Sequence, residues 1–480
     1  MMVLLVLVGA PLVAVAVTAA GAPVRIAGRV AAWLSLISVG AAVAAWAAVT
    51  AGDIPATGGL LRADALSTVL ALVVAVVSAL AAWLGPGLAD ADGLTPHQVR
   101  QYVIFSNLFA FTMLLAVTVS NVGLMWVAIE ATTIASAMLI PLRVSKSSVE
   151  ASWKYLLIGS VGIALAFVGT VLAYFDYVHR AGDAAQALNW PVLVAAAPRL
   201  HPVVMRIAFV FLLVGYGTKA GLAPMHTWLP DAHSEAPAPL SAMMSGVLLA
   251  VALYAIMRWK AVVDLSTGTA FTSGLLGALG LLSLVIAGFS LVTQRSYKRM
   301  LAYSSIEHTG LTCLGLALGP LGAFAALLHL VNHSLVKSVL FLLSGRVHHR
   351  YGTTDIAGVS GLLRAMPITG ALFAAGLLAA VGLPPFGLFI SELALLRAGF
   401  AGGHYVLMAV VLAVLVLVFV SLMSHLSRML YGTPTADIGE RERLPLVPLG
   451  ACLGGVVVLG ATLPWPLARL LVMGAQVVAR

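Results

Sequence analysis

Apolar residues in this chain come in long runs, separated by short segments that hold most of the charged and turn-forming residues. A run of about 20 residues is what an α-helix needs to cross the hydrocarbon core of a bilayer, which is about 30 Å thick. The pattern predicts fourteen transmembrane helices. They lie near residues 2–20, 26–50, 64–88, 102–119, 122–142, 153–175, 203–233, 238–258, 270–292, 299–319, 322–344, 366–400, 404–430 and 446–472.

Proline interrupts two of these helices, the seventh and the twelfth. Helix 7 contains Lys219 and is broken at Pro224, whereas helix 12 is broken at Pro384-Pro385 and carries Glu392 beyond the break. Each broken helix is the fourth in a block of five, helices 4–8 and helices 9–13. Broken helices at corresponding positions are typical of inverted-repeat transporters, whose ion sites lie near the middle of the membrane. We therefore expect an all-α polytopic membrane protein with two inverted five-helix repeats.

The amino terminus is interpreted as the first of these helices. Ala20-Gly21-Ala22 resembles a signal-peptide cleavage site, but no basic region precedes it and a second long apolar run follows. The expected units are 1–100 for helices 1–3, 101–260 for the first repeat, 261–432 for the second repeat and 433–480 for helix 14.

Composition supports the membrane assignment and excludes several functions. Of the 480 residues, 61% are hydrophobic and 9% are charged, against about 25% charged in soluble domains, and the mean hydropathy is +1.06. The net charge of +9 therefore concerns orientation and lipid contact and not nucleic acid. Cys313 and Cys452 cannot supply the four thiolates of an iron–sulfur cluster. Because no nucleotide loop or haem motif occurs either, we expect no cofactor and no metal.

Lys and Arg residues indicate the orientation. If the amino terminus is outside, fifteen of the 26 fall in inner segments and nine in outer segments, while Lys219 and Lys337 lie within the membrane. This bias predicts that both termini lie outside, in a bacterial inner membrane. The charged residues of the last inner loop are interpreted as an ordinary solvated face. They are Asp437, Arg441, Glu442 and Arg443.

Lys219 is the most unusual of the buried polar residues. A lysine in mid-membrane costs about 2.5–3.5 kcal/mol on insertion scales and faces the protein interior or a water-filled path. Glu130 stands alone in helix 5 among apolar neighbours. It is either a hydrogen-bonded packing residue or the partner of Lys219. In the second case, moving the carboxylate changes how tightly the lysine holds its proton, which is a workable element of a pump.

Helix 11 carries His329, His333 and Lys337 at steps of four, so the three side chains lie on one stripe. His-x-x-x-His spacing also suits zinc. However, this segment holds no acidic residue, and Lys337 would repel a cation. Hydrogen-bonded packing is a further alternative. Three titratable groups in a row favour a proton relay.

Two other polar segments have open interpretations. Glu307 and His308, in the cytoplasmic half of helix 10, either feed protons inward or form a local hydrogen-bonded pair. In the segment 226–237 we expect a structured re-entrant loop, whose polar residues cap the broken helix. They are Asp231, His233 and Glu235.

Three longer segments resemble one membrane-protein family. They are GYGTKAGLAPMHTWLPDAHSEAPAPLSAMMSG, KRMLAYSSIEHTGL and HLVNHSLVKSVLFLLSG. They are similar to the proton-translocating, antiporter-like subunits of respiratory complex I and related complexes. SSIEH and TKAGLAPMHTWLPDAHSEAPAP are most similar to the hydrogenase-4 component F group of that family. The similarity runs from about helix 4 to helix 13. It implies fourteen helices, two inverted repeats and a hydrated polar axis across the membrane.

By motif position, the resemblance implies proton transfer at single residues of helices 5, 7 and 12 and a relay on helix 11. The corresponding residues are Glu130, Lys219, Glu392, His329, His333 and Lys337.

Two departures from the family pattern stand out. Relatives usually carry a lysine or histidine on helix 8, but Ser241–Trp259 has no titratable residue before Arg258, and Ala250 stands where some relatives have the lysine. The link between the halves is then expected from water, from Ser245 or from a neighbouring element. The chain also lacks the long lateral helix of the largest complex I subunit, which favours the hydrogenase-type or shorter subunits.

These observations predict a proton-translocating, non-redox subunit of a bacterial respiratory oxidoreductase complex, hydrogenase-4-like or NADH–quinone oxidoreductase-like. Expected partners are other membrane-arm subunits, a peripheral hydrogenase or dehydrogenase arm, and lipids. The competing class is a cation/proton antiporter subunit or the membrane half of an inorganic-carbon uptake system. A purely structural subunit is disfavoured by the number of buried titratable groups.

Overall fold

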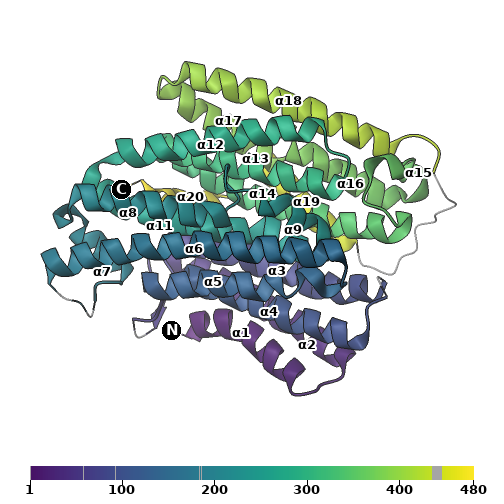
Figure 1. Ribbon diagram of the computed structural model, residues 1–480, viewed down its shortest axis with the longest axis horizontal. Coiled ribbons are helices and arrows are strands. Elements are labelled where there is room, and N and C mark those ends of the chain that lie inside the picture. Colours follow the sequence, from purple (N-terminus) through teal and green to yellow (C-terminus); the bar gives the residue numbers. More distant parts are fainter. Residues whose placement is uncertain are drawn as a thin grey trace.

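The computed structural model describes residues 2–57, 59–91, 93–182, 184, 186–434 and 446–479, and these are almost entirely helical (Figure 1). The elements of the first half are α1 (Met2–Ala19), α2 (Val24–Ala51), β1 (Ala56–Thr57), β2 (Leu61–Arg62), α3 (Ala65–Ala91), α4 (Pro96–Thr118), α5 (Val122–Ala137), η1 (Ile140–Leu142), α6 (Lys146–Ala181), α7 (Trp190–Ala196), η2 (Ala197–Arg199), α8 (Pro202–Lys219), α9 (Trp228–Glu235), α10 (Ala238–Met243), the π-helical segment η3 (Met244–Leu248) and α11 (Leu249–Thr267). Those of the second half are α12 (Thr269–Val292), α13 (Tyr297–Ala317), α14 (Gly319–Tyr351), η4 (Ile356–Gly358), α15 (Leu362–Ala365), α16 (Pro367–Ala380), α17 (Gly387–Ala401), α18 (Tyr405–Leu430), α19 (Val447–Ala461) and α20 (Trp465–Val478).

The long helices lie side by side, with α1 and α2 at one flank and α18 at the other (Figure 1). The centre is formed by α14 and by the continuous α10–η3–α11 span. In the most apolar stretch, 100% of the α10–α11 span and 94% of α14 is buried, against 33% of α18. The peripheral helices expose Leu, Val and Phe side chains, as lipid-facing helices do. The polar residues of the central helices therefore lie away from lipid.

Apolar side chains pack into two clusters that follow the two halves of the chain. One is built mainly on α1–α11 and the other mainly on α12–α19. α14 contributes to both, through Leu327 and Val331 to the first and through Val336 and Val339 to the second. α14 is therefore the element on which the halves meet.

Both predicted interruptions are present. α8 ends at Lys219 and α9 begins at Trp228, and α16 ends at Ala380 before α17 begins at Gly387. Each break contains a cis X–Pro peptide bond. The Trp228 indole N–H donates to the Thr218 carbonyl at 2.9 Å. This bond satisfies one of the carbonyls that the end of α8 leaves free.

The number of spans differs from the sequence prediction. Among the described residues, eleven helices are long and apolar enough to cross a membrane, or twelve if the bent pair α19–α20 counts as one span. The other two predicted spans correspond to α13, which is too polar to meet that measure, and to the α16–α17 pair, whose members are 14 and 15 residues long.

The prediction of one helix at 446–472 is wrong. α19 ends at Ala461, and α20 continues at an angle of 77° to it. Pro464 and Pro466 lie at the bend, where their fixed φ and missing amide hydrogens stop a helix from continuing. The charged residues of the last inner loop (Asp437, Arg441, Glu442 and Arg443) lie outside the described part of the chain.

Candidate functional site

Lys219, the last residue of α8, is fully buried against α5 and α6. Its Nζ donates hydrogen bonds to the Thr133 hydroxyl at 2.6 Å and to the Tyr155 hydroxyl at 2.7 Å. Thr133 donates to Glu130 Oε2 at 3.2 Å, and Ser160 donates to Glu130 Oε1 at 2.7 Å. Lys219 and Glu130 are therefore connected through the Thr133 hydroxyl, which accepts from the ammonium and donates to the carboxylate.

Glycines bring α6 and α8 close enough for these contacts. A Cβ on Gly215 would lie 2.5 Å from the Ala166 backbone nitrogen, and a Cβ on Gly162 would lie 2.7 Å from Thr218 Cβ. Both distances are shorter than non-bonded carbon contacts allow. A larger residue at either glycine would push the helices apart and withdraw Lys219 from its partners.

A second group of buried polar side chains, the α13–α14–α17 cluster, contains the other six predicted residues. All six are at most 9% exposed. They are Glu307 and His308 of α13, His329, His333 and Lys337 of α14, and Glu392 of α17.

Hydrogen bonds link the three helices of this cluster. His308 Nδ1 lies 3.0 Å from His329 Nε2, and His329 Nδ1 lies 3.0 Å from Ser391 Oγ. Ser391 donates its hydroxyl hydrogen to the Leu388 carbonyl at 2.8 Å. His329 Nδ1 is therefore the protonated nitrogen, and its Nε2 accepts from His308. The other His308 nitrogen, Nε2, lies 3.5 Å from Glu307 Oε2.

His333 and Lys337 extend the cluster along α14. His333 Nε2 lies 3.3 Å from the Ser245 carbonyl oxygen, and the His333 ring centroid lies 4.9 Å from that of His308. Lys337 Nζ donates to the Leu301 carbonyl at 3.1 Å. The stripe predicted on this helix therefore reaches α13 and the η3 segment.

The η3 segment occupies the position where the helix 8 titratable residue is missing. The Ser245 hydroxyl lies 2.6 Å from the Ser305 hydroxyl, and Ser305 donates to the Leu301 carbonyl that also accepts from Lys337. Ala250 lies one turn further along, in α11. Of the substitutes expected for that residue, the structure brings Ser245 into contact with the α13–α14–α17 cluster.

The acidic residues of α9 cross-link helices and do not cap the broken helix as expected. Asp231 forms ion pairs with Arg299 of α13 and with Lys154 of α6, the latter at 3.3 Å. Glu235 accepts a hydrogen bond from Ser147 at 2.9 Å. These contacts tie α9 to both halves of the protein.

His233 was not among the predicted transfer residues, yet it lies fully buried between the two polar sites. Its ring lies 6.1 Å from the Trp228 ring and 5.6 Å from the Phe341 ring. The Trp228 ring packs on the Tyr155 ring, with 4.7 Å between their centroids, and Tyr155 lies beside Lys219. No side-chain hydrogen bond to the His233 ring is present among the described residues. Sequence reasoning gave His233 a capping role in a structured re-entrant loop, because polar and proline residues surround it in the sequence.

The sequence model of one protein family, described as "NADH:quinone oxidoreductase/Mrp antiporter, TM", matches residues 119–418. The chain belongs to this family. It is an antiporter-like membrane subunit of the kind found in complex I, hydrogenase-4 and Mrp-type complexes.

Individual relatives agree with this assignment. The antiporter-like subunit is 41% identical over 346 residues to a "Hydrogenase-4 component F homolog" from Methylacidiphilum infernorum (isolate V4), with 72% of each chain covered. It matches a chain in the structure of the membrane-bound sulfane sulfur reductase, an archaeal respiratory membrane complex, with a TM-score of 0.89, 26% identity and coverage of 100% and 98%. It shares the fold of a chain of respiratory complex I from Thermus thermophilus, with a TM-score of 0.83, 20% identity and full coverage of both chains. These structural neighbours are subunits of multi-subunit membrane complexes.

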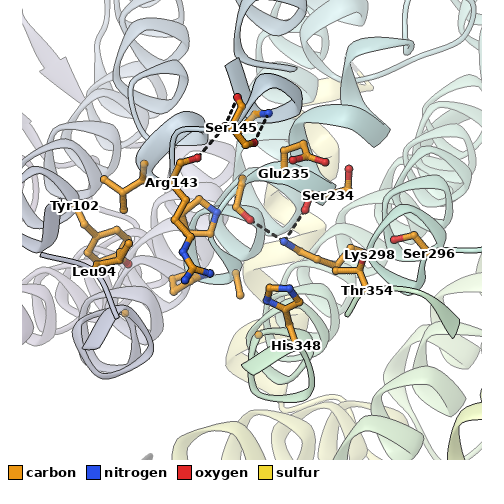
Figure 2. A pocket seen from close by; sticks show the side chains of 18 of the residues that line it. Leu94, Tyr102, Arg143, Ser145, Ser234, Glu235, Ser296, Lys298, His348 and Thr354 are labelled. Atoms are coloured by element: carbon orange, nitrogen blue, oxygen red, sulfur yellow. Dashed lines mark hydrogen bonds between the residues drawn. The ribbon is translucent and has the colours of Figure 1, made fainter. Parts of the chain in front are cut away.

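In the antiporter-like subunit, a cavity of about 450 Å³ opens where α4, α6, α10 and α13 begin, on the side predicted to be cytoplasmic. Figure 2 shows Arg143, Ser145, Glu235, Lys298 and His348 around it. Lys298 donates to the carbonyls of Ser234 and Ala236, at 2.8 and 2.7 Å. Since Ser234 follows His233 in the chain, the cavity reaches the backbone beside that buried histidine.

An ion pair joins α3 and α11 at the end of α3 opposite to this cavity. Arg258 donates two hydrogen bonds of 2.6 Å to the Asp64 carboxylate and one of 2.8 Å to Ser67. Asp64 precedes α3, outside its membrane span. Burial alone would raise the pKa of Asp64, but the Arg258 guanidinium outweighs it and holds that pKa below its usual value. The pair clamps the start of α3 onto α11.

One group of described residues also has the geometry of a metal site. A nitrogen of His308, a nitrogen of His329 and an oxygen of Glu392 all lie within 4.8 Å of one another. This arrangement suits a metal ion, although the sequence predicted none.

Proposed function

We propose that this antiporter-like subunit translocates protons in a respiratory oxidoreductase complex of the hydrogenase-4 or NADH–quinone type, while partner subunits transfer the electrons. The observation that carries the proposal is Lys219, a lysine without exposed surface whose hydrogen-bond acceptors are the hydroxyls of Thr133 and Tyr155. Burying a lysine is costly, and intramembrane lysines mark ion paths.

In this proposal Lys219 carries the proton, and Glu130 tunes how tightly it is held. The α13–α14–α17 cluster continues the path, and Glu392 serves as its terminal acceptor. His233 lies between the two sites and supports transfer from one to the other. The six residues of the cluster with assigned transfer roles are Glu307, His308, His329, His333, Lys337 and Glu392.

The proposed topology has fourteen membrane crossings and two inverted repeats, residues 101–260 and 261–432, between helices 1–3 (residues 1–100) and a terminal unit (residues 433–480). Both termini lie outside a bacterial inner membrane in this arrangement. The partners are other membrane-arm subunits and a peripheral hydrogenase or dehydrogenase arm. Identity to a hydrogenase-4 component F homolog favours the first of these arms.

A cation/proton antiporter subunit is the second candidate, since the family description includes Mrp antiporters. The two candidates differ in what drives the ion. A respiratory subunit moves protons when electrons flow, whereas an antiporter exchanges a cation for protons down a gradient.

The test is to purify the native assembly through a tag on this chain, identify its partners and reconstitute it into liposomes. We expect hydrogenase or dehydrogenase subunits to co-purify and the vesicles to acidify when hydrogen or NADH is supplied. Sodium-for-proton exchange without an electron donor, together with small antiporter subunits, would support the second candidate.

A further inference from the structure

The His308–His329–Glu392 group has features that a proton relay alone does not require. Its three ligand atoms come from α13, α14 and α17, and all lie within 4.8 Å of one another. The two nitrogens that face each other, His308 Nδ1 and His329 Nε2, are 3.0 Å apart. Two imidazoles on a tetrahedral zinc ion, with bonds of about 2.0–2.1 Å, hold their nitrogens about 3.3 Å apart. The nitrogen spacing is therefore close to that of a chelate, which the two rings reach by tilting until both lone pairs point at an ion beside the N–N line.

Outer partners orient both histidines toward such an ion. His329 Nδ1 donates to Ser391, whose hydroxyl is fixed by the Leu388 carbonyl, so Nε2 keeps its lone pair for a ligand. Glu307 lies 3.5 Å from His308 Nε2, where its carboxylate can accept a hydrogen bond from Nε2–H once the imidazole proton has moved from Nδ1 to Nε2 and freed Nδ1 for an ion. Metal-bound histidines are commonly held by such carboxylate and hydroxyl partners.

Charge favours a divalent ion. Binding of an ion would release the protons of Glu392 and Glu307, and the two carboxylates would then balance two positive charges around the neutral imidazoles. Lys337 opposes a cation, but its ammonium is bonded to the Leu301 carbonyl on the α13 backbone. His333, whose Nε2 lies 3.3 Å from the Ser245 carbonyl, faces the group without adding a fixed charge.

We propose that His308, His329 and Glu392 bind one divalent transition-metal ion with zinc-like preference, and that the bound ion blocks the proton path. The sequence disfavoured zinc because the helix 11 segment holds no acidic residue. The fold supplies acidic groups from α13 and α17, and it selects His308 with His329 as the histidine pair. The blocking effect rests on the proposed function, whereas the binding does not.

The binding test uses the native assembly containing the full chain, stripped with a chelator and dialysed against Zn²⁺. Zinc is counted by mass spectrometry in the wild type and in His329→Ala, Glu392→Gln and Ser391→Ala. The matched control is His425→Ala, which removes a buried histidine of α18 bonded to the Leu291 carbonyl. Co²⁺ binding, followed by its visible absorption, reports the coordination directly.

We expect His329→Ala to lose one zinc per chain and the four-coordinate Co²⁺ bands, while His425→Ala keeps both. Ser391→Ala keeps all three ligands but should bind about 10–100-fold more weakly, because it loses the partner that orients His329. Equal zinc content and Co²⁺ spectra in the wild type and all variants would overturn the proposal, since Ser391→Ala leaves the fold-forming residues in place.

Inhibition separates this inference from the proposed function. Zinc should inhibit proton movement by the wild type and inhibit Ser391→Ala at a 10–100-fold higher concentration. If zinc binds but proton movement continues uninhibited, the blocking effect is refuted. If zinc binds but the assembly moves no protons at all, the proposed function is refuted and the metal site stands.

Discussion

Lys219 occupies a position where charge is expensive, and the residues around it explain how it is tolerated. The Thr133 and Tyr155 hydroxyls accept its hydrogen bonds, and the Tyr155 ring centroid lies 4.7 Å from its Nζ. Glu130 bonds to the Thr133 hydroxyl and not to the lysine, so its carboxylate acts on Lys219 through that hydroxyl without direct contact.

Lys219→Ala should leave the assembly intact and strongly reduce proton translocation. The substitution removes a buried cation, and Glu130 keeps its bonds to Thr133 and Ser160. Lys219→Arg should fare little better, because arginine keeps the charge but does not release its proton. Proton movement in reconstituted vesicles is the measurement. Full activity of the arginine variant would show that Lys219 acts only as a fixed positive charge and not as a proton carrier.

Thr133→Val tests the bridge between Lys219 and Glu130. The two side chains have the same shape, so the variant removes only the shared hydroxyl and should lower translocation about 10-fold or more, as loss of a proton-transfer group does. Thr170→Val is the matched control, since Thr170 is a buried threonine of α6 whose hydroxyl donates to the Ala166 carbonyl of its own helix at 2.9 Å and does not contact Lys219 or Glu130. Equal rates in both variants would contradict the bridge.

The short helices that follow the two breaks place polar residues in contact across the protein. α9 bonds to α6 and α13 through Asp231, and α17 carries Ser391 and Glu392 to the histidines of α13 and α14.

Replacing Lys337 by Met or Glu392 by Leu should lower proton translocation while the chain still inserts and assembles. Each change removes a titratable group from the α13–α14–α17 cluster and substitutes an apolar side chain of similar size. Vesicle acidification and the yield of assembly are measured together. Unchanged acidification in both variants would favour the packing interpretation of these residues.

The clamp between α3 and α11 gives a prediction about stability. Asp64→Asn leaves Arg258 without its bidentate partner, and breaking a buried pair costs about 3–5 kcal/mol, so the thermal transition should fall at pH 7. Because the pKa of Asp64 is lowered in the fold, the contribution of the pair is complete above its ordinary value of about 3.9. It is lost as the pH falls through the lowered pKa.

The midpoint of thermal unfolding, measured from pH 8 to pH 3, checks this clamp. Wild type and Asp64→Asn should differ by a constant amount down to about pH 4 and converge below it. Asp53→Asn, at an exposed aspartate of the same segment between α2 and α3, is the control and should match the wild type.

Apolar runs located the helices apart from the bend between α19 and α20, and prolines located both breaks, because both kinds of signal are local. The contacts of the site were not local. His308 contacts His329, which lies 21 positions further along the sequence, and Ser391 contacts the same histidine from 62 positions away. Such distances in sequence leave no periodic pattern. The sequence left two interpretations of Glu130 open, and Thr133, which bonds to both Lys219 and Glu130, looked like any helix threonine.

Other features did leave a signal in the sequence, but a stronger neighbouring pattern favoured a different structure. Pro464 and Pro466 marked the bend between α19 and α20, yet the apolar run around them suggested one helix. The π-helical segment η3 has no comparable signature in the sequence, and it packs closely on α14. A Cβ on Gly246 would lie 2.4 Å from the Ser338 hydroxyl.

For the whole molecule, orientation is the decisive prediction. A reporter fused to the carboxyl terminus should be active in the periplasm, because the Lys/Arg bias places both termini outside. Activity on the cytoplasmic side instead would mean an odd number of crossings or the reverse orientation. A second reporter, after Thr433, should report the cytoplasm.

The interruption after Lys219 also has an electrical consequence. A helix carries about half a negative charge at its carboxyl end, which lies in water for most membrane spans. α8 instead ends inside the protein, and Lys219 is its final residue. The lysine therefore stands at the negative pole of its own helix, and that pole stays in place when Glu130 gains or loses a proton. The break thus supplies a permanent field at Lys219, and in the proposed function a change of charge at Glu130 needs to add only a little to it.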